Sequence, residues 1–152
     1  MIGLLTPEAV NARLKAQSKK QALQSVAKLM AGLTGQGEPA IFEVLLERER
    51  LGTTGMGRGI AIPHGKLGTL DRVYGGFFRL SEPIDFDALD DQPVDLMFVL
   101  LAPEAAKADH LKALARVTRV LRNERLCQML RGCDDPHGLV ALLSEGENRN
   151  AA

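Results

Sequence analysis

Aromatic residues are scarce in this chain of 152 residues: tryptophan is absent, and Phe, Trp and Tyr together make up 4% of it. The core must therefore be largely aliphatic. Proteins that bind single-stranded nucleic acids stack the bases on aromatic side chains, so the scarcity argues against that class. Lys plus Arg and Asp plus Glu both number 19. A net charge of zero gives no sign of a nucleic-acid or membrane partner.

Cysteine is also scarce, with Cys127 and Cys133 as the two examples. They form neither a CxxC motif nor a disulfide framework, which is typical of a protein from a reducing compartment. The N-terminus, MIGLLTPEAV, lacks the basic and apolar regions of a signal peptide. The longest apolar run, residues 96–102, is too short to span a membrane. We therefore predict a cytoplasmic protein without membrane insertion.

The order of apolar patterns predicts a single α/β domain. A short helix or turn is expected at residues 6–10, and Ser18, with Gln21 three residues later, is predicted to cap the helix that follows. Longer helices are expected at about 18–34, 39–51, 109–121, 124–130 and 134–143, and strands at 60–62, 73–80 and 94–101. Helices followed by strands and then by helices favour a central mixed β-sheet of four or five strands, flanked by helices on both faces. The polar segment 144–152, SEGENRNAA, is predicted to be a disordered tail.

The stretch GTTGMGRGIAIPHGK, residues 52–66, combines five glycines with one histidine, His64. Pro63 restricts the backbone before His64, and Gly65 lets the chain turn close beside the imidazole. Successive backbone N–H groups of such a loop can form an anion-binding concavity. Two interpretations stay open from local chemistry alone. Either the loop presents a reactive imidazole, or it is a glycine-rich turn with an incidental surface histidine.

Other motifs fail on spacing. A P-loop needs four residues between its glycines and a Ser or Thr after the lysine, whereas five residues separate Gly59 from Gly65 and Leu67 follows. The glycines at 55–59 lead from a helical pattern into a strand, the reverse of a dinucleotide-binding fingerprint. The three histidines lack the paired spacing of metal ligands, so no metal site is predicted. No GxSxG motif supports a serine hydrolase.

Polar residues near the predicted helix ends have ordinary explanations. The run Glu47-Arg48-Glu49-Arg50 closes the second long helix, and such runs usually form a solvated face with arginines favoured by the helix dipole. His110 is expected in the first turn of its helix, where histidine is tolerated, although a helix N-terminus also attracts anions. His137 is predicted to be a surface residue without a chemical role.

The segment LLERERLGTTGMGRGIAIPHGK, residues 45–66, resembles the phosphorylation-site region of enzyme IIA proteins of the phosphoenolpyruvate-dependent phosphotransferase system. The segments PIDFDALDDQPVDLMFVLLAP (83–103) and HLKALARVTRVL (110–121) agree with it. Within this family the chain is similar to the mannitol/fructose-type group, and most similar to its nitrogen-regulatory branch. The resemblance runs from about Leu4 to Leu143, so residues 1–143 are assigned to one enzyme IIA-like domain. Arg58 departs from the small polar residue that is usual in this branch.

The resemblance implies that His64 accepts a phosphoryl group, on Nε2, from the phosphohistidine of a small phosphocarrier protein. It also assigns Arg48 and His110 to the phosphorylation site. A guanidinium suits this role because its fork matches phosphate oxygens. A neutral imidazole, with a pKa of about 6.5, is a usable nucleophile near neutral pH. Neither ATP, a metal ion nor another cofactor is implied. Backbone N–H groups are further expected to bind the phosphoryl group around Gly55, Gly57, Arg58 and Gly59.

Two functions follow from the resemblance. The first is a regulatory phosphocarrier that controls protein targets by its phosphorylation state; potassium-transport components and sensor kinases are the implied target classes. The alternative is a sugar-specific IIA component that passes the phosphoryl group to an enzyme IIB. A third class, an interaction module without chemistry, would require an inert His64. A permease operon around the gene would favour sugar uptake, whereas a nitrogen sigma-factor neighbourhood would favour regulation.

Overall fold

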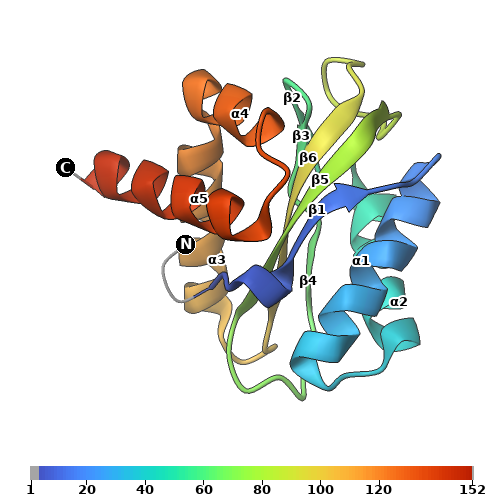
Figure 1. Ribbon diagram of the computed structural model, residues 1–152. Coiled ribbons are helices and arrows are strands. Elements are labelled where there is room, and N and C mark those ends of the chain that lie inside the picture. Colours follow the sequence, from blue (N-terminus) through green and yellow to red (C-terminus); the bar gives the residue numbers. More distant parts are fainter. Residues whose placement is uncertain (1–3, 152) are drawn as a thin grey trace.

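Within residues 4–151, the chain folds around a mixed six-stranded β-sheet with helices on both faces (Figure 1). The computed structural model describes the backbone of these residues and the side chains of residues 4–149. The elements are, in chain order, η1 (Pro7–Ala9), β1 (Val10–Leu14), α1 (Lys19–Thr34), α2 (Glu38–Leu51), β2 (Gly55–Gly57), β3 (Ile60–Ala61), β4 (His64–Lys66), β5 (Tyr74–Ile84), β6 (Val94–Ala102), α3 (Lys107–Leu121), α4 (Glu124–Arg131) and α5 (Pro136–Ala151).

The sheet has the strand order β1-β5-β6-β3-β2, and β4 also pairs with β6. Strand β5 is antiparallel to β6, whereas β1 is parallel to β5, and both β3 and β4 are parallel to β6. Strand β6 is buried along almost its whole length, as its near-continuous apolar sequence predicts. The predicted α/β fold with a central mixed sheet is therefore confirmed.

The helices separate into two layers, which Figure 1 shows on opposite sides of the sheet. Helices α1 and α2 pack on one face, where their apolar side chains form one core cluster with the sheet. Helices α3, α4 and α5 cover the other face around a second cluster. Ser18 caps α1 by accepting a hydrogen bond from the Gln21 backbone N–H at 3.1 Å, as the sequence predicts. Both layers are needed because each face of the sheet is apolar.

At the N-terminal end, the short helix expected at residues 6–10 is confirmed as η1, although it ends at Ala9. Val10 already begins strand β1, which pairs with β5 and which the sequence does not predict. At the other end of the chain, one prediction is wrong. The segment 144–152, expected to be a disordered tail, continues helix α5 as far as Ala151. Tertiary contacts explain this helix, because Gly146 lies against Leu126 and Glu147 forms an ion pair with Arg116 at 2.8 Å. Residues 1–3 and 152, which the predicted domain and tail include, lie outside the described residues.

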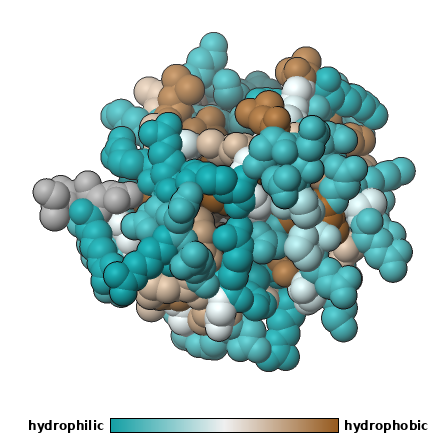
Figure 2. All heavy atoms as spheres, turned by 90° about the horizontal axis from the view of Figure 1, so that it is seen from above, coloured by the Kyte–Doolittle hydropathy of each residue, from teal (hydrophilic) through white to brown (hydrophobic). Residues whose placement is uncertain are grey.

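Most apolar side chains are inside the molecule. Figure 2 shows one end of it, where the surface is mostly hydrophilic and hydrophobic side chains occur in scattered groups. Among the described side chains, the large hydrophobic residues that remain exposed are Leu51, Met56, Leu89, Leu111 and Met129. None of the helices in residues 4–151 combines the length and the apolar character needed to cross a membrane.

Candidate active site: the His64 pocket

His64 begins strand β4, which lies along β6 just beyond β3. The interruption between the two strands is Ile62-Pro63, where Pro63 has no N–H but its carbonyl accepts a hydrogen bond from Leu100 N at 3.1 Å. Gly65 follows, and a Cβ atom at this position would lie 2.1 Å from Cγ1 of Val44 in α2. A glycine is therefore required for α2 to approach β4, and this approach places the C-terminal end of α2 beside His64.

The hydrogen bonds of the His64 ring distinguish its two nitrogens. Nδ1 lies 2.8 Å from the carbonyl oxygen of Ile62, which can only accept, so Nδ1 carries the proton. The lone pair is then on Nε2, which accepts a hydrogen bond from Nε of Arg48 at 3.3 Å. This arrangement leaves Nε2 as the nucleophilic nitrogen.

Arg48 stands in the last turn of α2 and makes two contacts in the site. Besides donating from Nε to His64, it donates from Nη1 to the carbonyl oxygen of Gly52 at 2.8 Å. The second bond anchors the guanidinium to the turn that ends α2. A positive charge is thereby held next to the nucleophilic nitrogen, where it can stabilise an incoming anion.

His110, in the first turn of α3, lies next to His64, with 5.4 Å between ring centroids and 60° between ring planes. Its side chain is buried, and within the described residues its Nδ1 has no hydrogen-bond partner. Burial, together with the nearby His64 and Lys66, lowers the pKa of His110 to about 4. His110 is therefore neutral at pH 7.

Burial also lowers the pKa of His64 below its usual value, and the nearby Arg48 charge acts in the same direction. The hydrogen bond to Ile62 opposes this effect without cancelling it. His64 is therefore neutral near pH 7, which is the state that a nucleophilic imidazole needs.

These side chains line a cavity of about 450 Å³ that opens between α2 and α3. The exposed Leu51 and Leu111 belong to its lining, so the entrance is partly apolar. The lining residues are Val44, Glu47, Arg48, Leu51, His64, Gly65, Lys66, His110, Leu111 and Leu114. A pocket with a neutral imidazole, a fixed guanidinium and an apolar rim is suited to receive an anionic group carried by another protein.

Two polar residues of this region are not identified by the sequence patterns. Lys66 follows His64 by two residues on β4 and adds a second cation to the pocket lining. The charged run predicts a solvated face for Glu49, but its side chain is buried and forms an ion pair with Lys19 at 2.7 Å. The helical spacing of Glu49 from the buried Ile41 and Leu45 was the signal that could have identified it.

The predicted phosphate-binding group of Gly55, Gly57, Arg58 and Gly59 does not join this pocket. These residues form the β2–β3 hairpin, and the carbonyl of Gly59 accepts hydrogen bonds from the backbone at Asp95 and Leu96. His64 instead pairs with Leu100, about 13 Å farther along β6. The prediction is corrected because the extended chain between the hairpin and His64 carries the glycines away from the imidazole.

Arg58 also makes its contacts outside the His64 pocket. Its φ of 58° places it in the left-handed region, which small polar residues tolerate better than arginine. Its side chain donates to the carbonyl oxygen of Arg122 at 3.0 Å and lies 3.7 Å from Glu124. Arg58 therefore connects the hairpin to the start of α4 instead of adding charge near His64.

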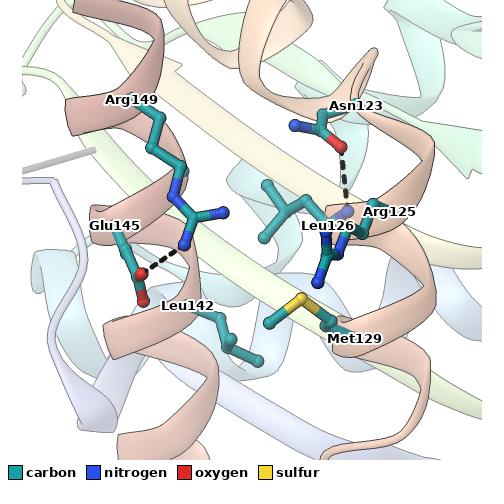
Figure 3. Close-up of a pocket in the computed structure, with 8 residues that line it drawn as sticks. Asn123, Arg125, Leu126, Met129, Leu142, Glu145 and Arg149 are labelled. Atoms are coloured by element: carbon teal, nitrogen blue, oxygen red, sulfur yellow. Dashed lines mark hydrogen bonds and ion pairs between the residues drawn. The ribbon is translucent and has the colours of Figure 1, made fainter. Parts of the chain in front are cut away.

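The other candidate sites are less suited to chemistry. Figure 3 shows a cavity between α4 and α5, lined by Leu126, Met129 and the Glu145–Arg149 ion pair among others, but its volume is about 20 Å³, little more than one water molecule. Within the described residues, no group of three His, Cys, Asp or Glu side chains is placed to hold a metal ion. His137 is exposed at the start of α5.

Comparisons with known proteins identify the family and agree with the fold. The family described as "Phosphoenolpyruvate-dependent sugar phosphotransferase system, EIIA 2" matches residues 3–146. A nitrogen regulatory protein of Bradyrhizobium diazoefficiens is 56% identical over 141 residues, which cover 93% of this chain and 92% of that protein. A nitrogen regulatory protein of Escherichia coli is 41% identical over 146 residues, with 95% and 89% covered. The crystal structure of the nitrogen regulatory protein IIA-Ntr from Neisseria meningitidis superimposes with a TM-score of 0.88 at 32% identity, covering 93% of this chain and 97% of that one.

Proposed function

Because the chain belongs to the EIIA 2 family of the phosphoenolpyruvate-dependent phosphotransferase system, we propose that it is a regulatory phosphocarrier whose His64 accepts a phosphoryl group. The donor is the phosphohistidine of a small phosphocarrier protein. The observation that carries the proposal is the orientation of His64: Nδ1 donates to Ile62, so Nε2 faces Arg48 with its lone pair available.

The transfer exchanges one P–N bond for another. Nε2 of His64 attacks the phosphorus atom, the P–N bond to the donor imidazole breaks, and its electron pair returns to the donor nitrogen. Such a step needs in-line positioning and charge stabilisation more than covalent assistance. Arg48 and Lys66 supply positive charge at the oxygens of the transferred group. The neutral, buried ring of His110 completes the binding site beside them, and no cofactor takes part.

The relatives favour regulation over sugar uptake. The proteins that are 56% and 41% identical over nearly the whole chain are both named nitrogen regulatory proteins. A phosphoryl group on His64 would add roughly two negative charges and three acceptor oxygens between Leu51 and Leu111. A partner that buries unmodified His64 would then meet a desolvation penalty, whereas a partner with basic groups would bind better. This physical change is the proposed switch, and the cytoplasm is its proposed location.

The transfer is tested by supplying phosphoenolpyruvate, enzyme I and the phosphocarrier protein and measuring the intact mass. The wild type should gain one phosphoryl group that is lost in acid, because the adduct is a phosphoramidate. His64→Ala should gain none, and His137→Ala, which changes an exposed histidine, should react as the wild type does. An unmodified wild-type mass while the carrier itself becomes phosphorylated would contradict the proposal.

The regulatory role is tested separately by affinity capture of partners from the native cytoplasm. Wild type and His64→Ala are compared, each with and without prior treatment by the phosphoryl donor system. Phosphorylated wild type should lose or gain a partner that the variant retains or lacks. Identical partner sets, together with efficient transfer to a sugar-specific enzyme IIB, would instead support the sugar-uptake alternative.

A further inference from the structure

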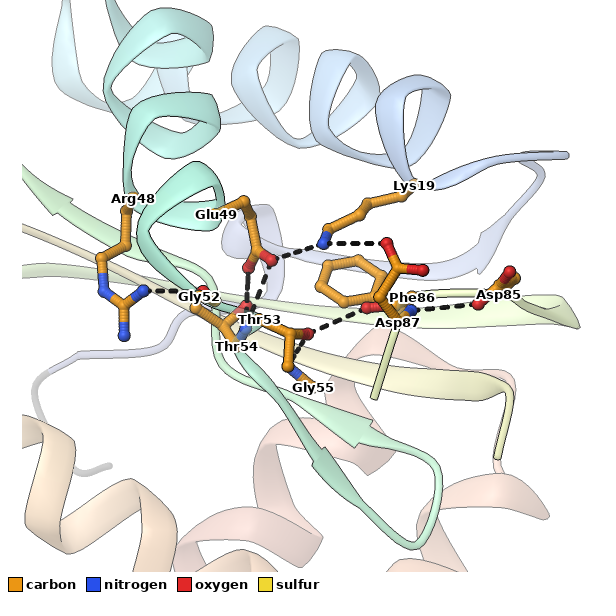
Figure 4. A network of polar contacts seen from close by, with 10 residues as sticks. All are labelled: Lys19, Arg48, Glu49, Gly52, Thr53, Thr54, Gly55, Asp85, Phe86 and Asp87. Atoms are coloured by element: carbon orange, nitrogen blue, oxygen red, sulfur yellow. Dashed lines mark hydrogen bonds and ion pairs between the residues drawn. The ribbon is translucent and has the colours of Figure 1, made fainter. Parts of the chain in front are cut away.

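A network of polar contacts joins the end of α2 that carries Arg48 to the start of α1 and to the segment after β5 (Figure 4). At its centre is Glu49, whose side chain is 3% exposed. Its carboxylate accepts hydrogen bonds from the backbone N–H of Thr54 at 3.1 and 3.2 Å, and from the Thr54 hydroxyl. It also forms the 2.7 Å ion pair with Lys19, from the first turn of α1. The proposed catalytic contacts described above use none of these groups.

A buried ion pair of this kind adds little to the free energy of unfolding, because desolvation of the two charges offsets their attraction. Its location suggests another role. Glu49 is the neighbour of Arg48 in α2, and its partner Thr54 lies two residues beyond Gly52, whose carbonyl holds the Arg48 guanidinium. The carboxylate therefore fixes the turn of residues 52–54 that ends α2.

Two hydrogen-bonded paths lead from this turn to the two nitrogens of His64. Along the first, the Gly52 carbonyl binds Nη1 of Arg48, which leaves Nε of the same guanidinium directed at Nε2 of His64. Along the second, the Thr54 carbonyl accepts from Ile62 N at 3.1 Å, and the Ile62 carbonyl accepts from Nδ1 of His64. Hydrogen bonds that follow one another in this way polarise and strengthen each other.

The network is also anchored from the opposite side. Lys19 lies 3.6 Å from Asp87 and 4.9 Å from the centre of the Phe86 ring. The hydroxyl of Thr53 donates to the Phe86 carbonyl at 2.9 Å and accepts from Gly55 N at 3.0 Å. The turn is thus fixed between α1, α2 and the segment after β5, which Figure 4 shows converging on it.

We infer that Glu49, held by Lys19, is a positioning residue that fixes the turn of residues 52–54 and so keeps Arg48 and the Nδ1–H tautomer of His64 aligned for phosphoryl transfer. The inference rests on the proposed function of His64 for its catalytic consequence. The alignment itself belongs to the unphosphorylated protein and can be measured there.

The first test is ¹⁵N NMR of the histidine rings in the unphosphorylated protein, with His64 assigned by comparison with His64→Ala. In the wild type, Nδ1 of His64 should be protonated and Nε2 unprotonated. In Glu49→Gln, which keeps the shape but loses the ion pair, and in Glu49→Ala, both nitrogens should shift towards values that reflect a mixture of tautomers. Glu43→Gln, which removes an exposed charge from the same helix, is the matched control and should leave the spectrum unchanged.

The second test is the initial rate of phosphoryl uptake. Misplacement of Arg48 and His64 should slow it about ten- to a hundredfold in Glu49→Ala, with a smaller effect in Glu49→Gln. Leu139→Val, in the core of α5, controls for a general loss of stability and should react at the wild-type rate.

Wild-type tautomers and wild-type rates in both Glu49 variants would overturn the inference. So would equal slowing in Leu139→Val, because the effect would then come from lost stability. If the wild type itself takes up no phosphoryl group, the proposed function fails, while the NMR comparison still decides whether Glu49 aligns His64.

Discussion

At the scale of single residues, a backbone carbonyl determines which nitrogen of His64 is free to act as the proposed nucleophile. Because the Ile62 oxygen can only accept, Nδ1 must donate, and Nε2 is left next to Arg48. Burial lowers the pKa of both His64 and His110, so both rings are neutral near pH 7 and Arg48 keeps its positive charge beside them. The result is one neutral nucleophile beside one permanent cation.

Arg48→Ala should slow phosphoryl uptake without unfolding the protein, since Arg48 is a half-buried residue at a helix end. Loss of a charge-assisted contact costs about 1.5–3 kcal/mol, or roughly ten- to a hundredfold in rate. Initial rates from intact-mass measurements provide the readout. Arg58→Ala is the matched control, because it removes the same charge from the β2–β3 hairpin. Wild-type rates in Arg48→Ala, or equal slowing in both variants, would contradict the assignment.

His110 should make stability depend on pH in a defined direction. Its pKa is about 4 in the folded protein and about 6.5 when unfolded, so the unfolded state binds the proton more tightly. The contribution to stability is complete above pH 6.5 and is lost as the pH falls towards 4, by on the order of 2–3 kcal/mol. Urea unfolding at pH 7 and pH 4.5 measures it. His110→Gln should lose less stability over this interval than the wild type, and an equal loss would contradict the assigned pKa.

At the scale of elements, the site depends on how closely α2 approaches β4. His64 comes from a strand on β6, Arg48 from the end of α2, and His110 from the beginning of α3 on the other face of the sheet. Gly65 is where α2 and β4 meet, and Val44 occupies the space that a Cβ atom would need. The distance between Arg48 and His64 therefore depends on the absence of a side chain at residue 65.

Gly65→Ala should push α2 away from β4, because the new Cβ atom would lie 2.1 Å from Val44. Overpacking of this kind costs about 1–3 kcal/mol. The thermal midpoint should fall, and phosphoryl uptake should slow because Arg48 moves with the helix. Adding Val44→Ala should restore part of both losses. A double variant no better than Gly65→Ala would show that the clash is not the cause.

At the scale of the whole molecule, the helices on the two faces of the sheet have different roles. Helices α1 and α2 hold the turn next to His64, whereas α4 and α5 pack against α3 and support the helix that carries His110. The last turns of α5 belong to this support, because Gly146 contacts Leu126 and Glu147 pairs with Arg116. The C-terminal segment is thus part of the fold.

Removal of residues 144–152 should therefore destabilise the protein by on the order of 1–3 kcal/mol, since packing and a partly buried ion pair are lost. The thermal midpoint should drop by several degrees. Arg149→Ala, which breaks only an exposed ion pair on α5, is the control and should change the midpoint little. An unchanged midpoint after truncation would support the disordered tail that composition alone predicts.

The amino-acid sequence by itself determined the α/β class, the buried strand of residues 94–101 and the cap at Ser18. These features depend on local chemistry: apolar periodicity and a capping hydroxyl. Local chemistry left the role of His64 open, and the family resemblance carried by the sequence proposed it together with Arg48 and His110. The prediction from composition was wrong at residues 144–151, because a polar composition gives no sign of contacts with residues far away in the chain.

Only the tertiary structure decided which polar groups meet. It placed the glycine hairpin of residues 55–59 away from His64, because an extended strand separates residues that are near in sequence. It buried Glu49 and joined it to Lys19, 30 positions earlier, where a charged run predicts a solvated face. It also selected Nε2, because the partner of Nδ1 is a backbone carbonyl whose direction depends on the path of the chain. Hydrogen-bond geometry and long-range packing are properties of the folded chain, and they cannot be predicted from the spacing of residue types in the sequence.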